Sequence, residues 1–266
     1  MRRRGGVRSL CFAARTGAVA LLLLSATPRP APATTLIVLV SHRAIVIGAD
    51  SMRTLVAGGT EAVCKIHDRD GVVYGFAGAV SAAQFDAAAI AARELGGGGD
   101  LAQKARRIAD SLQAGLVEHF RSRRIEGTRR ELVEAHRGRP VTGFIAALVD
   151  GKPQGFLVLV LAEPTADGVT LTTKVDPLDT RGPDRAIFLS SQHPEVIARA
   201  NRTMDGKAAA AVSELVSAAG DLIRLDLTLE EGRRPADRRS GPPVSVAVLD
   251  QDGFRFAVPG VCAGRP

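Results

Sequence analysis

Hydrophobic residues recur with two different spacings along this chain, and their order predicts its elements. Two runs, 34–41 and 43–50, are dense in β-branched residues and predict strands that are covered on both faces. A short polar turn separates them. Two further runs, 62–66 and 72–78, predict strands before the first helical spacing begins.

Helical spacing dominates two later regions. Residues 80–95 are rich in alanine, and the glycine run 96–99 ends the helix that they predict. A second helix is predicted over 101–121, where apolar residues recur at steps of three and four. Residues 194–225 are helical by composition, with a break at 205–206.

The other strand-like runs lie between and after these helices. Four of them precede the last helices: TGFIAALVD, GFLVLVLAE, VTLTTKV and RAIFLSS. VSVAVLD and FRFAV follow a polar loop at 229–242 and predict a closing hairpin. The order lacks βαβ alternation, which argues against a doubly wound parallel sheet. It predicts an α+β fold in which two antiparallel sheets pack together and are covered by helices.

Residues 1–33 have the organisation of a secretory signal peptide. A basic start is followed by the apolar run Gly17–Leu24 and a stretch of small residues that ends at Ala33. That run is shorter than the roughly 20 residues of a membrane-spanning helix. We expect cleavage after Ala33, a mature domain of residues 34–266, and a periplasmic or secreted protein without a stable membrane anchor.

The net charge of +7 belongs mostly to this leader. Residues 1–33 contain six arginines and no acidic residue, and the rest of the chain has 29 basic and 28 acidic residues. A nearly neutral domain with one tyrosine and no tryptophan offers little to a nucleic acid, so we expect no nucleic-acid partner. The scattered histidines form no cluster with metal-ligand spacing, and we expect neither a metal nor another cofactor.

Two cysteines, Cys64 and Cys262, remain after the leader is removed. An exported compartment permits a disulfide between them. Two buried free thiols are the alternative.

Cleavage after Ala33 gives Thr34 a free α-amine beside its hydroxyl. A threonine hydroxyl is a weak nucleophile, and one remedy is a base supplied by its own N-terminal amine. An α-amine suits that role because its ordinary pKa is about 7.7–8.0. Thr34 is therefore a candidate nucleophile.

Three stretches of the first half carry a resemblance: TTLIVLVSHRAIVIGADSMRT, AVCKI and VVYGFAG. They resemble the catalytic β-type subunits of the proteasome and the related bacterial heat-shock-locus protease. In that family a nucleophilic threonine opens the first strand and an acidic residue ends the second, sixteen positions later, as Thr34 and Asp50 do here. A lysine follows on the third strand, and Lys65 falls one residue early. The residue before the nucleophile, usually glycine, is Ala33.

The resemblance implies a role for each of these residues. The Lys65 ammonium would favour the deprotonated hydroxyl of Thr34, and Asp50 would pair with Lys65 and orient it. The N–H of Gly78, in the small-residue turn Ala77–Gly78, would bind the oxyanion.

Supporting residues for the terminal amine are implied in the second half. The family has an Asp-x-x-Ser-Gly segment before its penultimate strand, and Asp237, Ser240 and the following glycine stand directly before PPVSVAVLD. A further supporting serine corresponds to Ser190, with Ser191 as the alternative. Each of these residues could also be an ordinary turn or cap residue.

Substrate contacts follow from the same resemblance. The backbone of Arg53 and Thr54 would pair with an extended substrate. Val63 and Phe76 would lie near the specificity pocket. The family also implies the four-layer αββα sandwich of an N-terminal nucleophile (Ntn) hydrolase and assembly into homo-oligomers.

These observations predict an exported threonine-type amidohydrolase whose substrate is a peptide. Two alternatives stay open. The first is an amidase with the same fold that acts on an acylated amine or a cell-wall fragment, because a fold does not fix a substrate. The second is an exported scaffold without catalytic activity.

Overall fold

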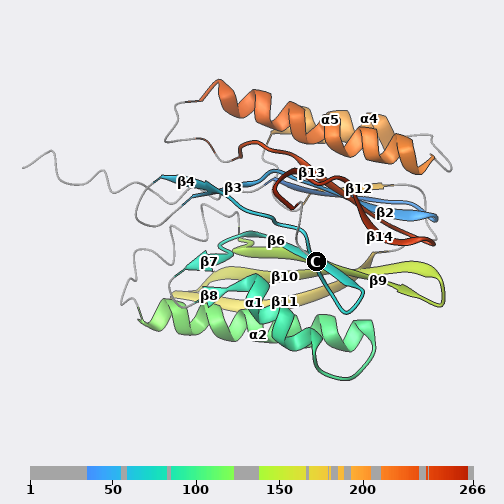
Figure 1. The fold of residues 1–266 in the computed structure, drawn as a ribbon. Helices are drawn as coiled ribbons and strands as arrows, with labels where there is room; N and C mark the ends of the chain where they lie inside the picture. Colours follow the sequence, from blue (N-terminus) through green and yellow to red (C-terminus); the bar gives the residue numbers. More distant parts are fainter. Residues whose placement is uncertain are drawn as a thin grey trace, which may run out of the picture. The chain divides into compact units, whose positions relative to one another are not determined.

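The computed structural model describes residues 35–54, 59–82, 85–122, 138–165, 168–178, 180, 185–188, 193–204, 211–233, 238 and 240–262. All of them belong to one compact unit, residues 31–266. Within the described residues, this unit contains two five-stranded antiparallel sheets, two short strand pairs and four α-helices (Figure 1).

The first sheet contains both ends of the described chain, in the order β12-β1-β2-β13-β14. Its strands are β1 (Leu36–Val40), β2 (Ala44–Ala49), β12 (Arg185–Phe188), β13 (Ser245–Asp250) and β14 (Gly253–Val258). Every pairing in it is antiparallel. The polar turn after β1 is closed by Ser41, whose Oγ accepts from the N–H of Ala44.

The second sheet has the order β11-β10-β9-β6-β5 and is also antiparallel throughout. Its strands are β5 (His67–Arg69), β6 (Val72–Gly78), β9 (Val141–Val149), β10 (Lys152–Thr165) and β11 (Gly168–Leu178). Two short pairs lie outside the main sheets: β3 (Met52–Thr54) with β4 (Thr60–Ala62), and β7 (Ser81–Ala82) with β8 (Phe85–Asp86).

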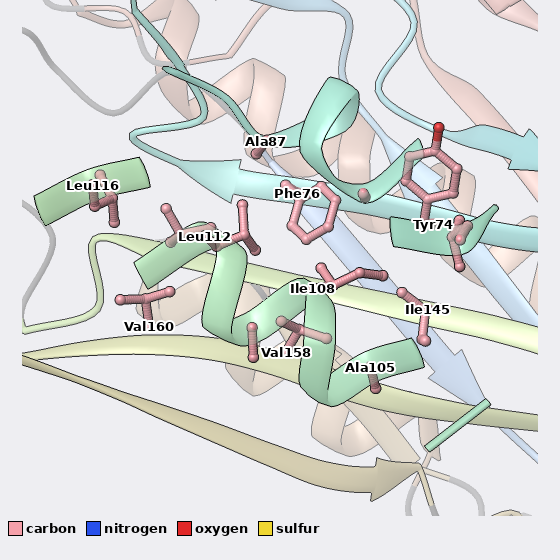
Figure 2. Close-up of a cluster of buried hydrophobic side chains, with 14 of the residues drawn as sticks. Tyr74, Phe76, Ala87, Ala105, Ile108, Leu112, Leu116, Ile145, Val158 and Val160 are labelled. Carbon is pink, nitrogen blue, oxygen red and sulfur yellow. The ribbon is translucent and has the colours of Figure 1, made fainter. Parts of the chain in front are cut away.

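Helices cover one face of each sheet. They are α1 (Ala87–Leu95), α2 (Leu101–Ser122), α4 (Pro194–Met204) and α5 (Val212–Glu231), and a short 3-10 helix, η2 (Gly260–Cys262), follows β14. Side chains of α1 and α2 pack on the second sheet, where Ile108 and Leu112 meet Phe76 and Val158 (Figure 2). Side chains of α4 and α5 pack on the first sheet.

The opposite faces of the two sheets share a third core. Strand β1 shows the division clearly, because Leu36 and Val38 point into this shared core while Ile37 and Leu39 point towards α4 and α5. Phe144 of the second sheet contributes to the same core. The expected α+β fold with antiparallel sheets is therefore confirmed, as are strands buried on both faces.

Two predicted boundaries are wrong. Helix α1 begins at Ala87 and not near residue 80, because the Asp86 carboxylate caps the helix by accepting from the N–H of Ala89. The strand expected over 62–66 is absent. Residues 63–66 lie between β4 and β5 as irregular chain.

Candidate active site

The site is built around Asp50, which directly follows strand β2. Its neighbour Ala49 is paired with Leu36 of β1 and with Ser245 of β13, so the carboxylate leaves the sheet at the end of its central strand. The N–H of Asp50 donates to the carbonyl of Thr35 across 3.1 Å. Asp50 is 1% exposed.

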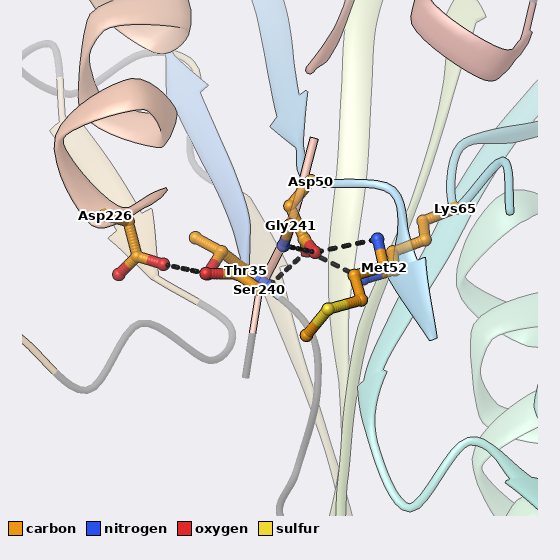
Figure 3. Close-up of polar contacts among 7 residues, drawn as sticks. All are labelled: Thr35, Asp50, Met52, Lys65, Asp226, Ser240 and Gly241. Atoms are coloured by element: carbon orange, nitrogen blue, oxygen red, sulfur yellow. Dashed lines mark hydrogen bonds and ion pairs between the residues drawn. The ribbon is translucent and has the colours of Figure 1, made fainter. Parts of the chain in front are cut away.

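Four donors surround this carboxylate (Figure 3). Oδ1 accepts from the Thr35 N–H at 2.6 Å and from the Lys65 Nζ at 2.7 Å. Oδ2 accepts from the N–H groups of Met52 at 3.0 Å and Gly241 at 3.1 Å. A carboxylate offers about four lone-pair sites, so the group is fully hydrogen bonded. That is the condition under which a buried ion pair is tolerated.

Lys65 reaches Asp50 from the irregular segment 63–66. The N–H of Val63 donates to the carbonyl of Ser51 across 2.7 Å, which fixes the start of the segment. Cys64 is bonded to Cys262 in a disulfide, with 4.9 Å between the two Cα atoms. The structure thus has a disulfide and not two free thiols, and it anchors the residue that directly precedes Lys65.

Burial dominates the electrostatics of this pair. Removal from water lowers the pKa of the Lys65 ammonium, and the charge of Asp50 opposes that shift. The positive charge of Arg53 lowers the pKa of Lys65 further. Burial likewise raises the pKa of the Asp50 carboxyl, against the opposing effect of Lys65 and of the backbone donors. The two groups titrate as a coupled pair.

A second acid, Asp226, lies beside this pair and was not predicted. It projects from helix α5, and its carboxylate accepts from the hydroxyls of Thr35 and Ser240 (Figure 3). The sequence did carry a signal for it. Leu222 and Ile223 define the buried face of α5, and Asp226 falls on that face although it is charged.

Ser240 and its neighbour Gly241 join the two acids. The Gly241 N–H binds Asp50, and its carbonyl accepts from the N–H of Ser51 at 3.1 Å. The Ser240 hydroxyl donates to Asp226 across 2.9 Å. Of the predicted catalytic residues, the structure therefore brings together Asp50, Lys65 and Ser240.

Three predicted residues lie outside the described part of the chain: Thr34, Asp237 and Ser190, as does the alternative Ser191. Their sequence neighbours are described. Thr35 directly follows Thr34, and its N–H and hydroxyl are held by Asp50 and Asp226.

The predicted substrate-binding residues lie in different elements of the fold. Arg53 and Thr54 lie in β3, which pairs with β4 only, within the described residues. The side chain of Arg53 forms an ion pair with Glu61 of β4. Val63 is half-buried at the start of the segment that carries Lys65.

Phe76 lies in β6, among the core side chains on the helix-covered face of its sheet. Alternation along β6 points Val73 and Ala77 into the core between the sheets, and turns Phe76 towards α1 and α2 (Figure 2). Phe76 is 5% exposed. Gly78 ends β6 with φ of 101°, a left-handed conformation that favours glycine.

The described residues contain no cluster of side chains suited to a metal ion. Within the described residues, no group of three or more His, Cys, Asp or Glu side chains could hold a metal ion. None of the helices in that same part of the chain is long and apolar enough to cross a membrane.

Comparison with known proteins gives information on the fold alone. No protein-family profile matches the chain, and no curated protein matches it. Among solved structures, it is similar to the Anbu (Gly-1) mutant from Hyphomicrobium sp. strain MC1, with a TM-score of 0.50. The sequences are 15% identical, and the match covers 84% of each chain. The likeness concerns the fold alone.

Proposed function

We propose that the mature chain begins at Thr34 and acts as an exported threonine-type amidohydrolase that cleaves peptides. One observation carries the proposal. The buried Asp50–Lys65 ion pair also binds the N–H of Thr35, so a lysine and an acid are fixed next to the residue that follows the nucleophile.

In the proposed reaction, the Oγ of Thr34 attacks the carbonyl carbon of the scissile amide while its proton moves to the α-amine. The electrons of the C=O bond move to oxygen, and this oxyanion accepts a hydrogen bond from Gly78. Collapse of the tetrahedral intermediate expels the amine product, which takes the proton from the ammonium. Water then hydrolyses the ester of the acyl-enzyme.

Lys65 assists by charge and not by proton transfer. Its ammonium favours negative charge on the attacking oxygen. Asp50 keeps that ammonium in place, because a buried lysine without a partner would lose its proton more readily. The contribution of Asp50 is therefore to orientation and to the charge state of Lys65.

The fold supports the same chemistry. Two antiparallel sheets share a core and carry helices on their outer faces, which is the arrangement expected of a four-layer Ntn hydrolase. Similarity to the structure of Anbu supports the same fold.

Two features support export. Residues 1–33 have the order of a secretory signal peptide. The Cys64–Cys262 disulfide suits an oxidising compartment such as the periplasm or the outside of the cell. Removal of the leader would then expose the nucleophile, so that export and activation are one event.

An extended peptide substrate fits β3. Since this strand pairs with β4 on one edge within the described residues, its other edge is suited to adding a strand. Arg53 and Thr54 would supply the backbone groups for that pairing.

Intact-mass analysis of the exported protein tests the proposal. We expect a chain that starts at Thr34 and gains the mass of one peptide epoxyketone or β-lactone probe. Thr34→Ala should abolish labelling, and Thr34→Ser, which keeps a hydroxyl, should retain it at a lower rate. A retained leader or a trimmed Thr34 would contradict the proposal.

Two further outcomes separate the alternatives. A chain that starts at Thr34 but takes up no probe would favour the scaffold without activity. Labelling without cleavage of any member of a peptide library would favour an amidase with another substrate.

A further inference from the structure

We propose that a cavity between the edge strands β5 and β14 binds an alkylammonium group, which is an apolar arm that ends in a positively charged amine. The cavity has a volume of about 310 Å³. Strand β5 ends the second sheet and β14 ends the first, so the cavity lies at one side of the core that the two sheets share. The proposal concerns binding and does not depend on catalysis.

The walls of the cavity next to the shared core are apolar. Ile66 is 2% exposed and belongs to that core, and Phe254 and Phe256 pack against it. The two phenylalanine rings meet edge to face, with 5.2 Å between their centroids, and the faces of such rings attract cations. Cys64, through its disulfide with Cys262, adds a further apolar surface. The volume is at the lower end of the range for small-ligand pockets, about 300–1,000 Å³, and suits an arm of several carbon atoms.

One carboxylate borders these walls without a partner. Asp68 lies in β5, two positions after Ile66, and borders the same cavity. Within the described residues, its carboxylate takes part in no hydrogen bond and no ion pair. Burial and the negative charge of Asp70 raise the pKa of the Asp68 carboxyl above its ordinary value. A cation bound beside it would stabilise the charged form.

The arginines near the cavity are already paired with other acids. Both terminal nitrogens of Arg255 donate to the Asp250 carboxylate, each across 2.7 Å. Arg69, which follows Asp68 in sequence, forms its ion pair with Asp70 at 3.7 Å. The charge left to balance at the cavity is therefore negative, which favours a cation over an anion as the ligand.

The cavity shares a wall with the segment that carries Lys65. Cys64 and Ile66 both border the cavity, and Lys65 between them donates to Asp50 across 2.7 Å. A bound arm would contact the residues on both sides of Lys65. Occupancy should therefore shift the backbone amide signal of Lys65 as well as those of the cavity residues.

Titration of the ¹⁵N-labelled exported protein, followed by amide chemical shifts, tests the proposal. The probe is N-acetyl-lysine methylamide. N-acetyl-norleucine methylamide is the matched neutral ligand, because it keeps the four-carbon arm and lacks the ammonium. We expect the lysine probe to bind with a Kd of about 1 mM and the norleucine probe to bind at least about tenfold more weakly. The largest shifts should fall on residues 64–68 and 254–256. Equal affinities, or shifts confined to another part of the molecule, would overturn the inference.

The same titration separates two sources of an alkylammonium group. Pentylammonium carries the group as a free amine, and the amide of N-acetyl-Ala-Lys-Ala carries it within an extended peptide. Because β14 pairs with β13 alone in the described part of the chain, its other edge is suited to pairing with a peptide backbone. Tripeptide binding at least about tenfold tighter than that of pentylammonium would identify a peptide as the source, and equal binding a free amine. Binding of neither compound would contradict the inference.

Substitution of Asp68 tests the charge. Asp68→Asn keeps the shape of the side chain, and we expect it to weaken the lysine probe at least about tenfold while the norleucine probe stays within about twofold. Asp70→Asn is the matched control, since Asp70 is exposed and lies outside the cavity lining. Asparagine also tolerates the φ of 54° at this position. The control should bind the lysine probe within about threefold of wild type. Wild-type affinity in Asp68→Asn would show that this acid does not hold the ligand.

A second variant tests the aromatic wall. Phe256→Leu keeps an apolar side chain and removes a ring, so it should reduce the preference for the lysine probe over the norleucine probe about threefold. An unchanged preference in both Asp68→Asn and Phe256→Leu would place the ligand elsewhere. The titration involves no turnover and no covalent probe. A protein that fails to label at Thr34 would therefore contradict the proposed function and leave this inference standing.

Discussion

The backbone N–H of Thr35 donates to Oδ1 of Asp50 across 2.6 Å, and the same oxygen receives the Lys65 ammonium. One carboxylate oxygen therefore accepts both from the main chain next to the proposed nucleophile and from the ammonium that is proposed to activate it. Any shift of Asp50 moves both. This geometry makes Asp50 the residue on which the alignment of the site depends.

Loss of either member of the ion pair should abolish activity, and loss of the Asp50 charge should also lower the stability of the fold. We expect Asp50→Asn and Lys65→Met each to reduce probe labelling at least about 100-fold. Asp50→Asn leaves a buried ammonium without its charged partner, which costs about 3–5 kcal/mol of unfolding free energy. Denaturant unfolding and labelling rates measure the two effects.

The exposed pair Lys174–Asp176 provides the control for those variants. Its side chains are 57% and 36% exposed, so Lys174→Met should change the unfolding free energy by less than about 1 kcal/mol. It should not change labelling. An Asp50→Asn protein with wild-type labelling would contradict the assigned role.

Gly75 of β6 should be intolerant of a side chain because of its contact with Lys65. A Cβ atom there would stand 2.7 Å from the Lys65 carbonyl oxygen and 2.9 Å from the Phe144 ring. We expect Gly75→Ala to displace the segment that carries Lys65, to lower labelling, and to destabilise the protein by about 1–3 kcal/mol. Gly98→Ala, where a Cβ meets nothing within 4 Å, is the control and should preserve both properties.

Reduction of the disulfide should affect the site and the fold together. The paired variant Cys64→Ser/Cys262→Ser is expected to lose about 2–5 kcal/mol of stability, because the bond closes a loop between residues 198 positions apart. Release of Cys64 should also slow labelling, since it directly precedes Lys65. A cavity of about 310 Å³ borders Cys64.

The same experiment can be run on the unmodified protein. Thermal unfolding and labelling are compared with and without dithiothreitol, and the double serine variant should be insensitive to the reagent. Labelling that is unaffected by reduction would show that the bond stabilises the fold without positioning Lys65.

Acid should weaken the contact between Asp250 and Arg255. Two hydrogen bonds from the Arg255 guanidinium, each 2.7 Å long, hold the pKa of the Asp250 carboxyl below its ordinary value. The folded state then binds a proton less readily than the unfolded state. The pair therefore stabilises the fold above the ordinary pKa of about 3.9, and this contribution is lost as the pH falls through the lowered folded-state pKa.

Arg255→Gln should expose this dependence. We expect it to lower the unfolding free energy by up to about 1 kcal/mol at pH 7. The difference from wild type should shrink as the pH is lowered towards 3. Arg224→Gln, which breaks an exposed pair with Asp221, should show no such pH-dependent difference.

Periodicity was sufficient to predict most of the sheets and helices. Strands such as β1 and β2 are short, continuous and apolar, and a helix such as α2 keeps its spacing over many turns, so local sequence dominates there. The segment 63–66 was mistaken for a strand because its composition suits one. Its conformation is set instead by partners distant in the sequence: Asp50, Ser51 and Cys262.

The same difference between local sequence and distant partners explains which site residues could be predicted. Asp50 and Lys65 could be predicted because both match the family motif, Asp50 at the family's spacing from Thr34 and Lys65 one residue early, and their contact is now seen directly. Asp226 could not be predicted from a motif, since its partners Thr35 and Ser240 come from other parts of the chain.

The bond between Cys64 and Cys262 also imposes an order of events during biosynthesis. Lys65 is made early, yet its covalent anchor cannot form until residue 262 has been synthesised and both sulfurs have met an oxidant. A nascent chain therefore has its lysine segment untethered for most of its synthesis. In the function proposed above, maturation therefore combines two chemical steps, cleavage of the peptide bond after Ala33 and oxidation of the two thiols.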